Sequence, residues 1–294
     1  RFIKISIKLN IIYYKKMKAL NFYPANEDIQ KYDSVDNYQQ IFIEYSKKVP
    51  SIEEALHELF LSTGISDQKA YELMEDILSK AKKVVEFNYE LINKEYQTIT
   101  TTDAIIISSY TCECETEYSN YSPYKILNRK LNEENRAESI KNISKYLFIF
   151  LKSLRKLPVV HPKGKYMYRC INKKVSLSED IFNKNIIPYR KGNTKIFWGF
   201  TSITSKINMT YKYKGKIKEI ENGSVFDLIG NIWGYDISLF NALIDEHIIL
   251  EPEMRSLVMD VVAPSSSNNN YAHIKCKIEK SHYILDDLIK RYTI

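Results

Sequence analysis

The hydrophobic pattern changes from a helical period to a strand period near Pro162-Lys163-Gly164, and this change limits the fold more than any other feature. Before it, apolar residues recur at three- and four-residue spacing, as on one face of a helix. After it, short apolar runs are separated by Gly, Asn, Pro or Ser clusters, which is typical of strands. No long helices alternate with these runs, which disfavours a doubly wound parallel sheet. We therefore predict an α+β fold with a helical part over 50–160 and a β-rich part over 161–294, whose strands lie near 165–171, 196–201, 224–229, 247–250, 255–262 and 271–278.

The helical part divides into segments at recognisable start and stop signals. Ser51 is followed by Glu54 at capping-box spacing, and Gly64 is a stop signal after the apolar residues behind it. A longer helix is predicted from Ser66, with one apolar stripe that continues to Ile92. Two further helices are then expected: a short one that starts at Thr102 or Asp103 and one near 133–157 that ends at Leu157-Pro158.

The first 49 residues fit neither part. Residues 1–16 alternate apolar side chains with lysine, serine and asparagine, which is a strand period that lysines interrupt. The residues that follow, up to Pro50, are polar and rich in tyrosine. We interpret residues 1–16 as an extension outside the fold, and the rest of 1–49 as a poorly patterned N-terminal segment.

Composition limits the partners of the chain. With 294 residues, 44% of them hydrophobic and 27% charged, the chain can bury a core. No run approaches the ~20 apolar residues that a membrane-spanning helix needs, so no transmembrane segment is expected, and a soluble protein of the cytoplasm or a secreted one both remain open. The net charge of +7 is modest, so no nucleic acid is expected as a partner. A Tyr/Lys stretch at 211–216 could follow a phosphate backbone, although a solvated hairpin is the favoured interpretation.

Cysteine and glycine usage narrows the chemistry further. Cys112, Cys114, Cys170 and Cys276 have no zinc-ligand spacing, so no metal is predicted. Free thiols are the default expectation, with one or two disulfides left open for a secreted protein. The chain has 8 glycines and no glycine-rich phosphate loop. Any bound nucleotide would therefore be held by side chains.

Three short stretches carry the candidate chemistry. Tyr168-Arg169 lies within the first predicted strand, and Trp198-Gly199-Phe200-Thr201-Ser202 begins in the second and ends one residue after it. Asp245-Glu246-His247 then precedes the apolar strand Ile248-Ile249-Leu250, which Pro252 ends. Together they resemble the motifs of the arginine-specific mono-ADP-ribosyltransferases, which have an aromatic-Arg strand end, an aromatic-Gly-Phe-x-Ser stretch and a Glu-x-Glu turn.

The resemblance extends over residues 50–294. An Asp-Ala-Ile helix at Asp103, a Tyr-x-x-Leu-Asn segment ending at Asn128 and a helix ending in Lys-Leu-Pro precede the arginine strand in the same order as in that family. It implies a helical subdomain followed by a split antiparallel β-sandwich around an NAD cleft. It also implies NAD as co-substrate, a protein acceptor modified on a side chain (arginine is expected), release of nicotinamide, and no metal.

The family's NAD contacts carry over to particular residues of this chain. Arg169, preceded by Tyr168, would bind the pyrophosphate, because a guanidinium matches phosphate oxygens. Gly199 would let the backbone approach the ligand, and the aromatic residues beside it, Phe200 with Phe197 and Trp198, would wall the nicotinamide. Thr201 belongs to the same cofactor-binding stretch. Ser202 would hydrogen-bond the nicotinamide ribose or orient the acidic residue.

The acidic turn departs from the family pattern. Where Glu-x-Glu is expected, this chain has Asp245-Glu246-His247. Alignment on the following strand puts Asp245 at the acceptor-activating position and His247 at the position of the catalytic glutamate. Glu246 could replace that glutamate if a bulge turned it inward, since strand side chains alternate between faces. Alternatively, Asp245 pairs with His247 and supplies the only negative charge, or all three are solvated loop residues of a degenerate site.

Three functions therefore remain open. The first is an active NAD-dependent transferase, with water as a competing acceptor. The second is a catalytically impaired relative that binds NAD or a protein. The third is a basic binding protein that uses the 211–216 hairpin.

Overall fold

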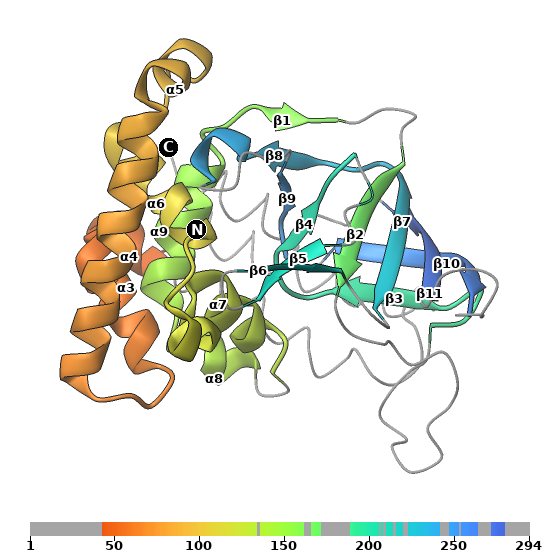
Figure 1. Ribbon diagram of the computed structural model, residues 1–294, viewed down its shortest axis with the longest axis horizontal. Coiled ribbons are helices and arrows are strands. Elements are labelled where there is room, and N and C mark those ends of the chain that lie inside the picture. The colour runs from red at the N-terminus through yellow and green to blue at the C-terminus, as the bar shows by residue number, and fades with distance from the viewer. Residues whose placement is uncertain are drawn as a thin grey trace, which may run out of the picture.

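The computed structural model describes most of the chain from residue 43 onward (Figure 1). The described residues are 43–133, 136–161, 166–171, 189–205, 207, 210–213, 216–219, 223–241, 247–252, 254–263 and 272–279. The helices are α3 (Ile52–Leu61), α4 (Asp67–Phe87), α5 (Tyr89–Glu95), α6 (Thr101–Thr111), α7 (Pro123–Leu131), α8 (Arg136–Lys141) and α9 (Ser144–Leu154), with 3-10 turns η2 (Thr116–Tyr121) and η3 (Ser238–Phe240). The strands are β1 (Val159–Val160), β2 (Met167–Ile171), β3 (Thr194–Phe197), β4 (Thr201–Ile203), β5 (Thr210–Tyr213), β6 (Lys216–Glu219), β7 (Ser224–Gly230), β8 (Gly234–Asp236), β9 (Ile248–Leu250), β10 (Met254–Val262) and β11 (Ala272–Ile278).

The helix starts follow side-chain caps. The hydroxyl of Ser51 accepts from Glu54 N at 3.1 Å, which confirms the predicted capping signal for α3. At α6 the cap is Thr100, not Thr102 or Asp103 as the sequence suggested. Asp103 occupies the third helical position and accepts from the backbone N–H of Thr100, completing a capping box. An acidic residue at that position looks like a cap when read from sequence alone.

Two other predicted helix boundaries are wrong. The apolar stripe expected to continue to Ile92 is interrupted at Asn88, where α4 ends and the short α5 begins. Leu91, which has the spacing of this stripe in the sequence, is 50% exposed, whereas Ile92 beside it is 3% exposed. The single helix predicted near 133–157 is two helices, α8 and α9. Both errors arise because apolar spacing continues through a break in the backbone.

Two sheets follow the helices. The first has the strand order β1-β8-β9-β4, the second has the order β2-β7-β11-β10-β3, and β5 and β6 form a separate hairpin. The described pairs are antiparallel except β7 with β11, which is parallel. The predicted α+β fold is confirmed. The strand predicted at 196–201 is in fact the end of β3 and the start of β4, one in each sheet, and β1 and β8 lack a sequence signal because they are only two and three residues long.

The four-stranded sheet lies between the helices and the five-stranded sheet, as Figure 1 shows. Its strand β9 contributes to two cores. Ile249 packs with the helices, whereas Ile248 and Leu250 pack in the core between the two sheets. None of the helices that the structure describes is long and apolar enough to span a bilayer. The middle sheet therefore connects the two parts predicted from the sequence, and it carries the candidate site.

Candidate active site

Arg169 lies in the middle of β2 and points toward the four-stranded sheet. Its Nη1 donates to Thr201 Oγ1 at 2.6 Å, and its guanidinium carbon lies 5.5 Å from the centroid of the Phe197 ring. Burial lowers the pKa of Arg169, but an arginine keeps its charge at neutral pH. No ion pair joins it to a carboxylate among the described residues. A desolvated cation of this kind is suited to an anionic ligand.

A backbone bridge holds β2 against β4. Tyr168 N donates to Thr204 O at 2.8 Å, and Thr204 N donates to Tyr168 O at 3.0 Å. This bridge joins the two sheets one residue before Arg169. Tyr168 therefore contributes at least its backbone to the site, because it sets the distance between Arg169 and Thr201.

Ser202 and His247 meet on the neighbouring strands β4 and β9. His247 Nε2 lies 2.8 Å from Ser202 Oγ, and His247 Nδ1 lies 3.1 Å from Asn241 Nδ2. With the Asn241 amide in this orientation, Nδ1 accepts a hydrogen bond, so the ring proton is on Nε2 and is donated to Ser202. The imidazole is thus held at both nitrogens in its neutral form.

The backbone of His247 is fixed as well. Its N–H donates to Ser238 Oγ at 2.9 Å, and its carbonyl accepts from Ile237 N at 2.9 Å. Ser238 in turn donates from both its hydroxyl and its backbone N–H to Asp236 Oδ1, at 2.5 and 2.9 Å. The turn around η3 therefore places the His247 side chain opposite Ser202.

Burial lowers the pKa of His247 to about 4, against a smaller opposing effect of the Asp236 carboxylate. The ring is therefore uncharged at neutral pH and supplies no negative charge. Asp245 and Glu246 lie outside the described residues, so the bulge that would turn Glu246 inward remains a prediction. The same holds for the acceptor-activating role expected of Asp245.

Thr201 and Ser202 point to opposite sides of β4. Thr201 is fully buried and bonded to Arg169, whereas Ser202 is exposed and bonded to His247. Arg169 and His247 therefore approach the same strand from its two sides. Thr201 was expected to contact the ligand directly. Its hydroxyl instead accepts the hydrogen bond from the Arg169 guanidinium.

Phe200 and Gly199 have packing roles that the sequence motif did not indicate. Phe200 is 1% exposed and packs edge-on against Phe150 and Tyr110, with centroid separations of 5.0 and 5.7 Å. Its ring lies in the helical core and not in an open cleft. Phe200 therefore packs the core, whereas the sequence suggested that it would wall the nicotinamide. A Cβ at Gly199 would come within 2.6 Å of Asn128 Oδ1, so this glycine admits α7 close to the start of β4.

Two asparagines that the sequence analysis did not select as site residues also lie at the site. Asn128 Nδ2 donates to the Tyr110 hydroxyl at 3.3 Å, while its Oδ1 is buried with no hydrogen-bond partner. Asn128 ends the Tyr-x-x-Leu-Asn segment, so a signal existed. Asn241, which orients His247, belongs to no motif, and only the turn around η3 brings it there.

The cysteines take no part in this site. Cys112, Cys114 and Cys276 are buried, Cys170 is half-buried, and none forms a disulfide. Burial raises the pKa of Cys112 to about 11 and that of Cys276 to about 12, so these thiols stay protonated at neutral pH. Within the described part of the chain, no group of three or more His, Cys, Asp or Glu side chains could hold a metal ion.

Comparison with known proteins gives matches only at the level of structure. No family model and no curated protein sequence matches this chain. The search of solved structures finds bacterial proteins that superpose on this chain, ADP-ribosyltransferases among them. The type III effector XopAI of Xanthomonas axonopodis pv. citri superposes with a TM-score of 0.50 at 12% identity, covering 84% of this chain and 98% of that one.

Other matches are solved structures of ADP-ribosyltransferases. HopU1 of Pseudomonas syringae pv. tomato DC3000 has a TM-score of 0.44 at 15% identity, covering 69% of this chain and 87% of that one. The Vis toxin of Vibrio splendidus has a TM-score of 0.40 at 15% identity, covering 71% of this chain and 88% of that one. At such identities a likeness concerns the fold alone, and of these three structures only XopAI reaches a TM-score of 0.50.

Proposed function

We propose that this chain binds NAD and transfers its ADP-ribose to a protein side chain, with arginine as the expected acceptor and nicotinamide as the leaving group. The observation that carries the proposal is a network of two hydrogen bonds to adjacent residues on opposite sides of β4. Arg169 bonds Thr201, the next residue Ser202 bonds His247, and these residues belong to the three motifs noted in the sequence. The motifs are far apart along the chain, so their meeting at β4 supports a common site.

The residues of this network suit the parts of NAD. Arg169, half-buried and without an ion pair to a described carboxylate, would hold the pyrophosphate, since phosphate oxygens match a guanidinium. Ser202, exposed on the other side of β4, would hydrogen-bond the nicotinamide ribose. Because Arg169 and Ser202 lie on different sides of β4, they would contact different halves of NAD.

Bond cleavage needs a negative charge near the ribose, because positive charge develops there as nicotinamide leaves. His247 is neutral at pH 7 and does not provide it. In the active form of the proposal, Asp245 or Glu246 supplies this charge. Loss of one such group typically lowers the rate by ~10²–10³-fold.

The neutral His247 also favours a second candidate function, a catalytically impaired relative that binds NAD or a protein. In this case Ser202 and His247 would hydrogen-bond the ribose hydroxyls without stabilising the developing charge. Binding of NAD would be retained and turnover lost. The two candidates differ in one measurable quantity, the rate of nicotinamide release.

The test is nicotinamide release by the purified chain, measured together with the NAD-induced rise in melting temperature. The variants are Glu246→Gln, Asp245→Asn, His247→Glu and Arg169→Ala, and Arg129→Ala, an exposed arginine of α7, is the matched control. We expect Arg169→Ala to lose the melting-temperature rise and Arg129→Ala to retain it. Loss of turnover in Glu246→Gln or in Asp245→Asn would identify the anion.

The other outcomes separate the alternatives. A silent parent that gains turnover in His247→Glu supports the impaired relative. If neither the parent nor His247→Glu releases nicotinamide and NAD leaves the melting temperature unchanged, the NAD proposal is wrong. Salt-sensitive binding of nucleic acid that Arg169→Ala does not alter would then favour the basic binding protein. Free ADP-ribose measured against ADP-ribosylated arginine peptide distinguishes water from a protein acceptor.

A further inference from the structure

Leu239 and Phe240 end the turn η3, and their carbonyls accept hydrogen bonds from side chains of the helices. The carbonyls of the two residues before them, Ile237 and Ser238, accept from backbone N–H groups of the turn itself. The final carbonyls of a helical turn lack such donors, because the chain has left the helical path. The helices therefore complete the hydrogen bonding of η3.

The first of these donors is Asn88, the residue between α4 and α5. Asn88 Nδ2 donates to Leu239 O at 2.8 Å, and the two residues are 151 positions apart in the sequence. A carbonyl oxygen only accepts, so this bond also fixes which way the Asn88 amide faces. The Asn88 side chain makes no capping bond to α5. At the break between the two helices, this amide thus contacts η3 and does not cap the helix that follows.

The second donor is Thr111, the last residue of α6. Its Oγ1 lies 3.1 Å from Phe240 O and 2.8 Å from Ser108 O. A hydroxyl has one proton, so these two acceptors share it. The end of α6 is therefore bonded to the carbonyl that follows the one held by Asn88.

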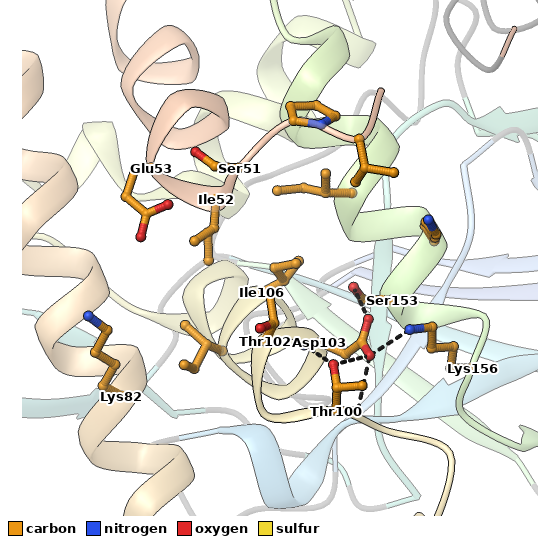
Figure 2. A pocket seen from close by; sticks show the side chains of 15 residues that line it. Ser51, Ile52, Glu53, Lys82, Thr100, Thr102, Asp103, Ile106, Ser153 and Lys156 are labelled. Atoms are coloured by element: carbon orange, nitrogen blue, oxygen red, sulfur yellow. Dashed lines mark hydrogen bonds and ion pairs between the residues drawn. The ribbon is translucent and has the colours of Figure 1, made fainter. Parts of the chain in front are cut away.

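The start of α6 is fixed to α9. The Asp103 carboxylate accepts from Thr100 N and Oγ1 at 3.0 and 2.5 Å, from Ser153 Oγ at 2.9 Å and from Lys156 Nζ at 2.6 Å. Figure 2 shows these bonds at the wall of a cavity among the helices. Because the backbone bonds of a helix fix its residues relative to one another, this attachment also positions Thr111 at the other end.

Apolar packing adds to the two bonds. Phe240 is fully buried, and its ring centroid lies 5.7 Å from that of Tyr96, which follows α5 and is 8% exposed. Ile237, just before η3, is also fully buried in the core that the helices form. The turn is therefore held against the helices by both hydrogen bonds and side-chain burial.

The position of η3 controls the hydrogen bonds of His247. Ser238 Oγ accepts from the His247 N–H, Ile237 N donates to the His247 carbonyl, and Asn241 bonds the ring at Nδ1. These three contacts leave Nε2 directed at Ser202. A displacement of η3 would change all three at once.

We propose that Asn88 and Thr111 are positioning residues of the candidate site, which hold η3 so that Asn241 keeps the His247 ring against Ser202. They act through η3 and not by contact with a substrate. The relevance of this arrangement to catalysis rests on the proposed function. The hold on the His247 ring does not, and it is measurable without NAD.

The test is a long-range proton–nitrogen NMR spectrum of the histidine rings in the full chain, with His247 assigned by the signal that His247→Gln removes. The parent should show one neutral tautomer for His247 at pH 7. In Asn88→Ala we expect a mixture of both tautomers and a His247 pKa raised from about 4 by about 0.5 or more, because a looser η3 admits water to the ring. Thr111→Val should act in the same direction, whereas Thr111→Ser keeps the hydroxyl and should match the parent.

Each variant has a matched control. Asn93→Ala makes the same change at an exposed asparagine of α5. Thr98→Val removes a hydroxyl that donates to Lys156 O at 3.1 Å, a bond of the same kind that does not involve η3. Both should keep the tautomer and the pKa of the parent. Circular dichroism melting verifies that every variant is folded at the temperature of the spectra.

The inference is overturned if the parent itself shows mixed tautomers, if folded Asn88→Ala or Thr111→Val keeps the parent's tautomer and pKa, or if the controls change them as much. NAD is then added to the parent as a separate measurement. If NAD leaves the melting temperature of the parent unchanged, the proposed function fails, while a changed His247 ring in Asn88→Ala still supports the hold on η3.

Discussion

At the scale of single residues, His247 has the clearest physical constraint. Asn241 and Ser202 bond its two ring nitrogens, and Ser238 bonds its backbone N–H, so both its position and its tautomer are set. Its pKa of about 4 follows from burial, which disfavours the imidazolium. A residue held so firmly in the neutral form acts as a hydrogen-bonding group and not as a charge.

This constraint predicts a loss of stability in mild acid. The pKa of His247 is about 4 in the folded state, below the ordinary histidine value of 6.5. Between these values the unfolded chain takes up a proton that the folded chain does not, so stability falls as pH drops from about 6.5 toward 4. At pH 5 we expect this group to lower the free energy of unfolding by about 1 to 2 kcal/mol relative to pH 7, since one pKa unit is about 1.4 kcal/mol.

Urea unfolding of the parent and His247→Gln at pH 7 and pH 5 measures this contribution. Glutamine keeps hydrogen-bonding capacity but does not titrate, so the difference between the two proteins should shrink at pH 5. Other groups titrate equally in both and cancel in the comparison. A difference that is the same at both pH values would contradict the low pKa.

Gly199 and Asn128 are a second residue-scale feature. A Cβ at position 199 would lie 2.6 Å from Asn128 Oδ1 and 3.0 Å from Asn132 Nδ2. The glycine motif therefore reflects helix-to-strand contact as much as access for a ligand. This close contact leaves Asn128 Oδ1 buried and unpaired beside the motif that carries Ser202.

At the scale of elements, one ion pair connects α9 to the end of β9. Arg155 Nε and Nη2 donate to the two carboxylate oxygens of Glu251 at 2.7 and 2.6 Å, and the Tyr235 hydroxyl also donates to Glu251 at 3.1 Å. The side chains of Arg155 and Glu251 are only 12% and 15% exposed. This bidentate pair fixes the helical layer to the strand that presents His247.

Removal of the Glu251 carboxylate should lower the free energy of unfolding. Glu251→Gln removes the carboxylate charge that the largely buried Arg155 side chain contacts through both Nε and Nη2, and we expect a loss of about 3 kcal/mol in the free energy of unfolding. The matched control is Glu279→Gln, which breaks the more exposed pair with Arg255, with 34% and 38% exposure, and should cost about 1 kcal/mol or less. Urea titration of both variants checks the ranking, and equal losses would contradict it.

The elements also show where sequence patterns succeed. The caps at Ser51 and Ser66 start α3 and α4 as expected, because a cap is a local hydrogen bond between residues three apart. The break at Asn88 and the split of one predicted strand into β3 and β4 were not predicted. Both depend on which neighbour each segment packs against, and apolar spacing carries no information about that.

At the scale of the whole molecule, β9 connects two cores. Ile249 is fully buried among the helices, and Ile248 is 5% exposed in the core between the sheets. Adjacent residues of one strand thus belong to different cores, because strand side chains alternate between faces. The helical and β-rich parts should therefore unfold together.

Ile248→Val and Ile249→Val test this cooperativity with the same chemical change on opposite faces. Each should cost about 0.5 to 1.5 kcal/mol. Helical circular dichroism and the fluorescence of Trp198 and Trp233 should report one shared melting temperature in the parent and in both variants. If Ile249→Val lowers only the helical transition while tryptophan fluorescence is unchanged, the two parts are independent.

The sequence by itself determined the α+β fold, the order of helices before strands, and the three stretches that carry Arg169, Ser202 and His247. These follow from periodicity, caps and short motifs, which are local properties of the chain. Only the tertiary structure decided that Thr201 is used to hold Arg169, that Phe200 is core, and that Asn241 orients His247. Each of these depends on contacts between residues far apart in sequence or on a turn geometry, and hydrophobic spacing does not encode which partner a buried side chain meets.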